Sequence, residues 1–150
     1  MAYHKKNIFE RFRILKDYGS DREWINILEK KIADLGIKIY KKRLEHILIL
    51  NENLIKLDVY KKHYYRISIN IYDKFINDKK EDLEKLLEKY IEDLKKNRKF
   101  DAVLGGCKIG PHKSDIVGYN IENNFNINQF STGQQKAVIL LIILAHCNFL

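Results

Sequence analysis

Apolar residues recur every three or four positions along most of the first 100 residues, a spacing that predicts amphipathic helices. One helix is expected over residues 8–17, a second over residues 24–54 and a third over residues 83–94. The second helix would have about nine turns. The first 100 residues are therefore expected to form a helical hairpin of the coiled-coil type.

Two local signals predict where the long helix starts and where it bends. Ser20 and Glu23 have the Ser-x-x-Glu spacing of a capping box, so the helix is expected to start near Asp21. Gly36 interrupts the apolar stripe. Because glycine costs about 1 kcal/mol against alanine inside a helix, a bend is expected at this position.

Other segments have the pattern of strands. Isoleucine alternates with polar residues over residues 66–71, which predicts a half-buried strand in the connection of the hairpin. Residues 108–112 and 116–121 are expected to form two more short strands separated by a turn. A continuous apolar run over residues 137–145 predicts a helix that must be covered on every side. The chain contains too few predicted strands to cover it.

Charge is distributed unevenly along the 150 residues. The chain has 28 Lys and Arg against 20 Asp and Glu, a net charge of +8, and 45% hydrophobic residues, which argues against a disordered chain. Residues 101–150 carry three basic and three acidic side chains, so the first 100 carry 25 and 17 and hold the whole surplus. The basic helices are either a solvated face or a surface for a phosphate backbone. The tyrosines among them suit nucleic acid or a protein core equally well.

Several chemistries are disfavoured by the sequence. Cys107 and Cys147 cannot form a disulfide framework and are expected to be reduced thiols of a cytoplasmic protein. The longest apolar run is far shorter than the roughly 20 residues that span a bilayer, so no membrane partner is expected. The five histidines lack the spacing of zinc ligands, and no catalytic triad is visible. We therefore expect neither a metal site nor a catalytic residue.

The sharpest motif is Phe130-Ser-Thr-Gly-Gln-Gln-Lys136, which opens the apolar helix. Ser131 can cap this helix, Gly133 allows the close approach of another group, and Lys136 adds a cation. The free amide groups and the positive dipole end of a helix start attract anions. An ordinary capped helix would have the same pattern, but two adjacent glutamines before an apolar run favour a functional site.

A second glycine-rich segment, residues 105–114, only partly matches a phosphate-binding loop. The pattern GxxxxGK[ST] requires Lys and then Ser or Thr after Gly110, where this chain has Pro111 and His112. Proline also lacks the amide group that such a loop uses. The segment is either a turn between strands or a structural part of a larger nucleotide site.

The order of these features resembles the RecF family of DNA replication and repair proteins, an SMC-like branch of the ABC-type ATPases. The similar positions in the last third of the chain are Arg98-x-x-Asp101, Gly105, Gly110-Pro-His-Lys-Ser-Asp115 and the Ser131 motif before an apolar helix that ends Leu144-Ala-His146. The similar positions upstream are Arg11-x-Arg13-x-Leu15-Lys16, Trp24, Leu28-Glu29, Ala33 and Arg43. The resemblance covers nearly the whole chain. The family has arginine where this chain has Lys113, which keeps the charge but loses bidentate contacts.

The resemblance implies a nucleotide site shared between subunits. The ABC signature, which would complete an ATP site on the phosphate loop of a partner subunit, would be Ser131, Thr132, Gly133, Gln134 and Gln135. Ser131 and the Gly133 amide would contact the γ-phosphate. ATP and Mg²⁺ are the cofactors implied for the complete parent protein, and none is expected to bind stably to this chain alone.

The resemblance also implies partners. The family binds single-stranded or gapped duplex DNA when ATP closes a homodimer through the ATPase heads. It acts with recombination mediator proteins to load recombinase in repair, replication and the SOS response. From matching positions, the residues expected to contact DNA are Arg11, Arg13 and Arg43.

The fold class predicted from all of this is α+β and mostly helical. A helical arm, or lever lobe, is expected over residues 1–97, followed by an incomplete piece of an ABC-type ATPase head over residues 98–150. No GxxxxGK[ST] sequence occurs, and the family has its phosphate loop upstream of the arm and its Walker B acids downstream of the signature helix. The chain is thus expected to be the central fragment of a RecF-type protein, without ATPase activity when alone.

Two other functions fit the same sequence. The chain could be a non-enzymatic, basic helical module that binds a partner protein, or a part of a different SMC-like head with the same signature. The favoured function is a fragment of an ATP-dependent DNA-binding protein of recombinational repair and replication.

Overall fold

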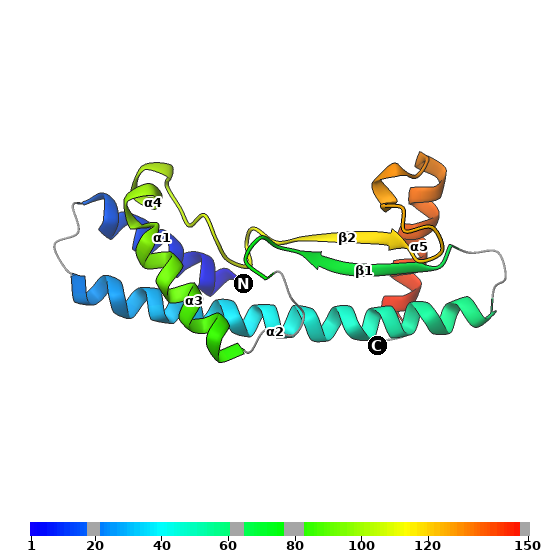
Figure 1. Ribbon diagram of the computed structural model, residues 1–150, viewed down its shortest axis with the longest axis horizontal. Helices are drawn as coiled ribbons and strands as arrows, with labels where there is room; N and C mark the ends of the chain where they lie inside the picture. Colours follow the sequence, from blue (N-terminus) through cyan, green and yellow to red (C-terminus); the bar gives the residue numbers. More distant parts are fainter. Residues whose placement is uncertain (18–21, 61–64, 77–82, 148–150) are drawn as a thin grey trace. The chain divides into compact units, whose positions relative to one another are not determined.

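The computed structural model describes residues 1–17, 22–60, 65–76 and 83–147, and these residues form helices and one small sheet (Figure 1). The elements are α1 (Ala2–Lys16), α2 (Arg22–Tyr60), β1 (Ile67–Tyr72), α3 (Leu83–Lys96), α4 (Arg98–Leu104), β2 (Asp115–Asn120), the 3-10 helix η1 (Ile127–Gln129) and α5 (Thr132–Cys147). The mostly helical α+β prediction is confirmed.

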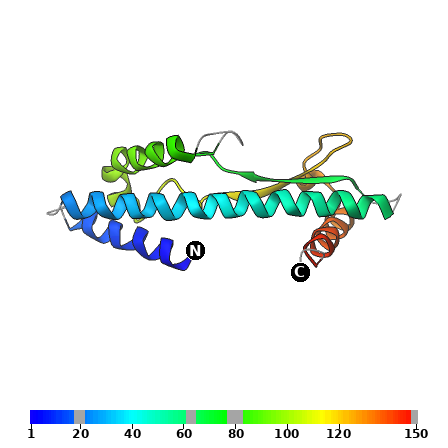
Figure 2. The same cartoon turned by 90° about the horizontal axis from the view of Figure 1, so that it is seen from below.

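The chain divides into two compact units. Unit 1 comprises residues 1–41 and 73–114, and unit 2 comprises residues 42–72 and 115–150. Helix α2 is continuous and contributes its first part to unit 1 and its second part to unit 2 (Figure 2). Both units draw on the range predicted as arm and on the range predicted as head, and that division at residue 97 stays a prediction.

Helix α2 confirms the predicted long helix but not its bend. It has 39 residues and continues without interruption through Gly36. A Cβ atom at this position would collide with Tyr90 Cε1 and lie 3.4 Å from His4 Nε2. Overpacking of this kind typically costs about 1–3 kcal/mol. Glycine is therefore needed here for the close approach of α3, and the expected capping box at Ser20 lies outside the described residues.

The core of unit 1 is aliphatic and aromatic. Its buried members are Ile8, Leu28, Ile32, Ala33, Tyr40, Phe75, Leu86, Tyr90, Leu94 and Cys107. The Phe75 ring lies between two tyrosines, with centroid distances of 6.2 Å to Tyr40 and 4.9 Å to Tyr90. The Tyr40 hydroxyl donates a hydrogen bond of 2.7 Å to Asp73 Oδ2, which satisfies both buried polar groups.

Two segments of unit 1 differ from the sequence prediction. The sequence pattern did not predict α4, which has only seven residues and thus too few turns to show a period. The strand predicted over residues 108–112 is wrong, because these residues form turns. Gly110 has a φ of 122°, outside the range of a strand, and Pro111 cannot donate to a ladder.

Unit 2 is built around an antiparallel pair of strands. Strands β1 and β2 pair with Ile67 opposite Asn120 and Ile71 opposite Ile116, so both predicted strands are confirmed. The buried apolar residues of unit 2 come from α2, β1 and α5: Ile47, Leu50, Leu54, Ile67, Ile69, Val138, Leu141 and Ala145. Asn51 fixes α2 to the sheet, since its side chain accepts from Ile69 N and donates to Ile69 O, both at 2.8 Å.

Helix α5 has apolar side chains on all sides, but only one side of the helix is buried. Val138, Leu141 and Ala145 are buried, whereas the large apolar side chains exposed on the rest of the helix are Ile139, Leu140, Ile143 and Leu144. This agrees with the expectation that the chain has too little sheet to cover the helix. In the part of the chain that the structure describes, no helix has the length and hydropathy of a membrane span.

Candidate nucleotide-phosphate site

The start of α5 is a capping box. Ser131 N donates to Gln134 Oε1 at 2.9 Å, and Gln134 N donates to Ser131 Oγ at 3.4 Å. This reciprocal pair satisfies backbone donors that the first turn of a helix would otherwise leave without a protein partner. Ser131 therefore caps α5, as the sequence predicted.

The two adjacent glutamines hold the segment in place. Gln134 Nε2 donates to the Tyr65 hydroxyl at 2.8 Å, and the rings of Tyr65 and Phe130 lie 5.2 Å apart. Gln135 Nε2 donates to Phe130 O at 3.1 Å and lies 3.4 Å from two carbonyl oxygens of η1. Both glutamines thus have a structural role, so their adjacency alone does not require a ligand.

The first turn of α5 stays open to solvent. Ser131, Thr132 and Gly133 are exposed, and a Cβ atom added at Gly133 would have no neighbour within 4 Å. Lys136, one turn further along, is exposed as well. A phosphate group could therefore reach the backbone amides at the positive end of the helix dipole.

The three arginines predicted to contact DNA have different surroundings. Arg13 is exposed on α1 in unit 1, and Arg43 is half-buried on the part of α2 that belongs to unit 2. The Arg11 side chain is only 1% exposed. A side chain this buried is not placed to contact DNA, whereas the DNA contacts of Arg13 and Arg43 stay predictions.

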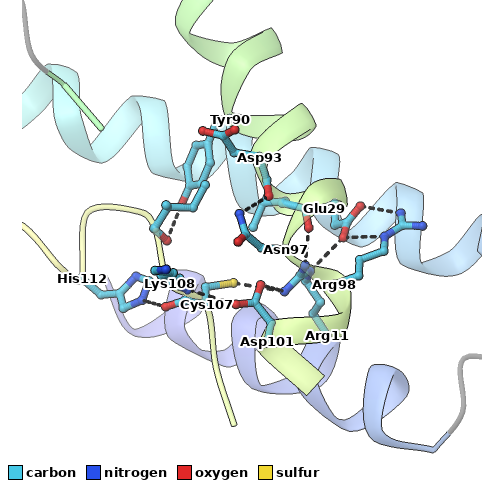
Figure 3. Close-up of polar contacts among 12 residues, drawn as sticks. Arg11, Glu29, Tyr90, Asp93, Asn97, Arg98, Asp101, Cys107, Lys108 and His112 are labelled. Atoms are coloured by element: carbon cyan, nitrogen blue, oxygen red, sulfur yellow. Dashed lines mark hydrogen bonds and ion pairs between the residues drawn. The ribbon is translucent and has the colours of Figure 1, made fainter. Parts of the chain in front are cut away.

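The Arg11 guanidinium lies at the centre of a buried polar network in unit 1 (Figure 3). It donates to Glu29 Oε1 at 2.9 Å, to Asp101 Oδ2 at 2.7 Å and to Leu94 O at 2.6 Å. Arg11 Nη1, the atom that donates to Asp101, also lies 3.4 Å from Cys107 Sγ. These bonds join α1, α2, α3, α4 and the loop after α4.

Charge in the network is balanced. Glu29, which is fully buried, accepts from both Arg11 and Arg98, and Asp101 accepts a second hydrogen bond from Lys108 N at 3.2 Å. Two guanidinium groups therefore face two carboxylates. Buried charges are tolerated when they are paired and hydrogen-bonded, which this arrangement achieves.

Burial and charge act together on the titrating groups of the network. Burial acts to lower the pKa of Arg11, but the neighbouring Cys107, Asp101 and Glu29 outweigh it and raise that pKa. Burial raises the pKa of the Cys107 thiol to about 11, although the Arg11 charge acts in the opposite direction. The thiol is therefore protonated at neutral pH, which makes it a poor nucleophile.

His112 is half-buried in unit 1, and its ring has two neighbours there. Its Nε2 donates to Cys107 O at 3.0 Å, and its ring centroid lies 6.0 Å from that of His4. Burial lowers the pKa of His112, and the charges of Lys113 and Lys5 lower it further. Among the described residues, no group of three or more potential ligands could hold a metal ion.

These features define the class of protein: a mostly helical α+β chain with an exposed, serine-capped helix start. No protein-family model matches the chain. The DNA replication and repair protein RecF of Rickettsia prowazekii (strain Madrid E) is 32% identical over 140 residues, which are 93% of this chain and 38% of that protein. RecF of Rickettsia felis is 29% identical over 143 residues, 95% of this chain and 38% of that protein.

Solved structures agree with these relatives. The structure of the recombination mediator protein RecF-ATP in the RecFOR pathway matches with a TM-score of 0.80 and 20% identity over 95% of this chain and 38% of that one. Its RecF-ATPrS counterpart matches with a TM-score of 0.79 and 21% identity. The chain belongs to the RecF family. It spans about 38% of the length of the relatives that it matches.

We predict that Asp101→Asn lowers the free energy of unfolding by about 3 kcal/mol, because it leaves the buried Arg11 charge without one of its two carboxylates. Urea unfolding followed by circular dichroism measures this change. The control is Glu92→Gln, which removes one partner of the exposed pair with Lys96 and should change the free energy by less than about 1 kcal/mol. Equal losses in the two variants would contradict a structural role for the network.

We also predict that acid weakens the fold through His112. Because its pKa is lower in the folded chain than the ordinary value of 6.5, the unfolded chain binds a proton first as the pH falls. The contribution of His112 is thus fully present above pH 6.5 and declines as the pH falls below that value. The free energy of unfolding of His112→Gln, measured from pH 7.5 to 5, should fall less steeply than that of the wild type. Parallel curves would contradict this assignment.

Proposed function

We propose that the chain supplies the signature half of an ATP site that closes on the phosphate loop of a partner subunit. The observation that carries this proposal is the exposed, serine-capped start of α5, with Gly133 open to solvent. Ser131 Oγ and the Gly133 amide would face the γ-phosphate, and Lys136 would add positive charge. The chain itself contains no GxxxxGK[ST] sequence that could cradle the phosphates or ligate Mg²⁺.

In the proposed site, this chain completes the ATP site of a partner subunit and does not catalyse hydrolysis when it is isolated. A γ-phosphate held by the partner would place negative charge next to donors that the capping box has already oriented, so little ordering would be needed on closure. ATP would therefore join two heads without bond breaking by this chain. The name of the RecF-ATP structure, which matches this fold, supports ATP as the nucleotide.

We propose further that unit 1 binds the phosphate backbone of single-stranded or gapped DNA in recombinational repair and replication. Unit 1 holds 21 basic and 15 acidic residues, and unit 2 holds 7 and 5, which together give the net charge of +8. On the solvent side of α1, the exposed cations are Lys5, Lys6, Arg13 and Lys16. Such a surface would bind phosphate without reading base sequence.

The nucleotide proposal predicts an association that depends on ATP. The chain can be labelled with a fluorescent maleimide at Cys147, which is exposed, because Cys107 is buried with a raised pKa. Fluorescence anisotropy is then measured on titration with the RecF of Rickettsia prowazekii, which is similar to this chain. Binding should require ATP, and Ser131→Arg should weaken it by at least about tenfold, since an arginine would occupy the place of the γ-phosphate.

The control for this titration is Glu52→Arg, which adds an arginine at an exposed position of α2 in the same unit. It should leave the ATP-dependent binding unchanged. Binding that does not depend on ATP, or that Ser131→Arg does not affect, would overturn the proposed site.

The DNA proposal predicts binding that weakens steeply with salt. For about four phosphate contacts, the affinity for a labelled gapped duplex should fall roughly 100-fold between about 50 and 200 mM salt. Arg13→Glu in unit 1 should weaken binding and flatten this salt dependence, more than Lys56→Glu at an exposed position of α2 in unit 2 does. An affinity that does not change with salt would rule out a phosphate-contact mechanism.

A further inference from the structure

Helices α1 and α4 of unit 1 expose a group of large apolar side chains. The exposed fractions are 60% for Phe9, 49% for Phe100, 86% for Val103 and 61% for Leu104. Scattered apolar residues on a surface need no explanation, but a group from two packed helices does. We call this group, together with Phe12, the α1–α4 patch.

Contacts within unit 1 bring the α1 and α4 parts of the patch close together. Helices α1 and α4 pack against each other. The rings of Phe9 and Phe12 lie 6.4 Å apart. Phe12 Cζ lies 3.8 Å from the place of a Cβ atom on Gly105, the residue that follows Leu104 at the end of α4. Phe12 therefore links the exposed ring of α1 with the end of α4.

The border of the patch is basic. Lys16 follows Phe12 by one turn of α1, and Lys99 lies on α4 beside Phe100. The Lys108 ammonium lies 4.7 Å from the centroid of the Phe100 ring, so a cation covers the edge of the apolar surface. All three lysines are exposed. The centre of the patch is thus apolar and its border carries positive charge.

The patch is formed in advance of any binding. The buried ion pair between Arg11 of α1 and Asp101 of α4, at 2.7 Å, holds the two helices together. Arg11 and Asp101 point into the unit, whereas Phe9 and Val103 face solvent on the same helices. A partner would therefore pay little for ordering this surface.

We propose that the α1–α4 patch docks an amphipathic helix of another protein, with an apolar stripe flanked by aspartate and glutamate. Apolar anchors in the centre with complementary charges on the border are typical of helix-in-groove recognition. A second copy of this chain would bring lysines against lysines. DNA would pair with the cations but would leave Val103 and Leu104 in water.

The test uses a designed probe and matched variants of the full chain. The probe is a fluorescein-labelled peptide of about 16 residues with a leucine stripe and glutamate flanks, long enough to form a helix when bound. Anisotropy should show saturable binding. Leu104→Glu should weaken it by at least about tenfold, because the new carboxylate faces the glutamates of the probe without burying apolar area.

The control is Leu48→Glu, since Leu48 and Leu104 are both 61% exposed and Leu48 lies in unit 2. It should leave probe binding unchanged. A probe with lysine in place of glutamate should not bind. Saturable binding with this pattern would support the proposal.

Four results would overturn the proposal. The first is no saturable binding of the acidic probe, and the second is equal loss in both leucine variants. The third is self-association in sedimentation, or binding to phosphatidylglycerol vesicles, that Leu104→Glu abolishes; these would identify a second copy or a lipid surface as the occupant. The fourth is displacement of the probe by duplex DNA, which would assign the patch to the DNA surface of unit 1.

Discussion

The arrangement of unit 1 depends on the burial of one positive charge. A guanidinium removed from water costs several kcal/mol unless all its donors find acceptors, so the fold must bring acceptors to Arg11 from wherever they lie in the chain. Those acceptors are Glu29, Leu94 O and Asp101, which are 18, 83 and 90 residues away in sequence. Because the acceptors lie on three different helices, a shift of any one helix would leave a buried charge unsatisfied. The network thus specifies how α1, α2, α3 and α4 pack.

This constraint also shapes the surface. Among the described residues, one buried base, Arg11, stands against three buried acids, Glu29, Asp73 and Asp101. Burying more acid than base makes the solvent-facing part of unit 1 more basic than its composition alone indicates. The polar network in the core and the positive surface are therefore two consequences of one distribution of charge.

The sequence allowed the long elements to be predicted because their periods extend over many residues. The apolar residues of helix α2 recur with a period of 3.6 residues, and those of strand β1 with a period of two. The apolar run of α5 predicted a helix that the few predicted strands could not cover. Arg11 could not be predicted in the same way. In sequence it is one cation in a basic segment, and only its partners, far away in the chain, distinguish a buried arginine from one that contacts phosphate. Residues 108–112 were mistaken for a strand for a similar reason, since the approach of Tyr90 to Gly110 is a tertiary contact.

The candidate nucleotide site shows how a motif and a structural requirement can share residues. Within the motif, Ser131 and Gln134 satisfy each other as a capping box, and Gln135 ties the preceding turn to the helix. Any helix that begins after an extended segment benefits from such bonds, so these residues alone would not distinguish a ligand site from a stable helix start. Packing within this chain does not explain Gly133, because a Cβ atom at this position would have no neighbour within 4 Å. In the proposed nucleotide site, a glycine next to the backbone donors of a helix start would let the γ-phosphate of a nucleotide held by the partner subunit approach closely.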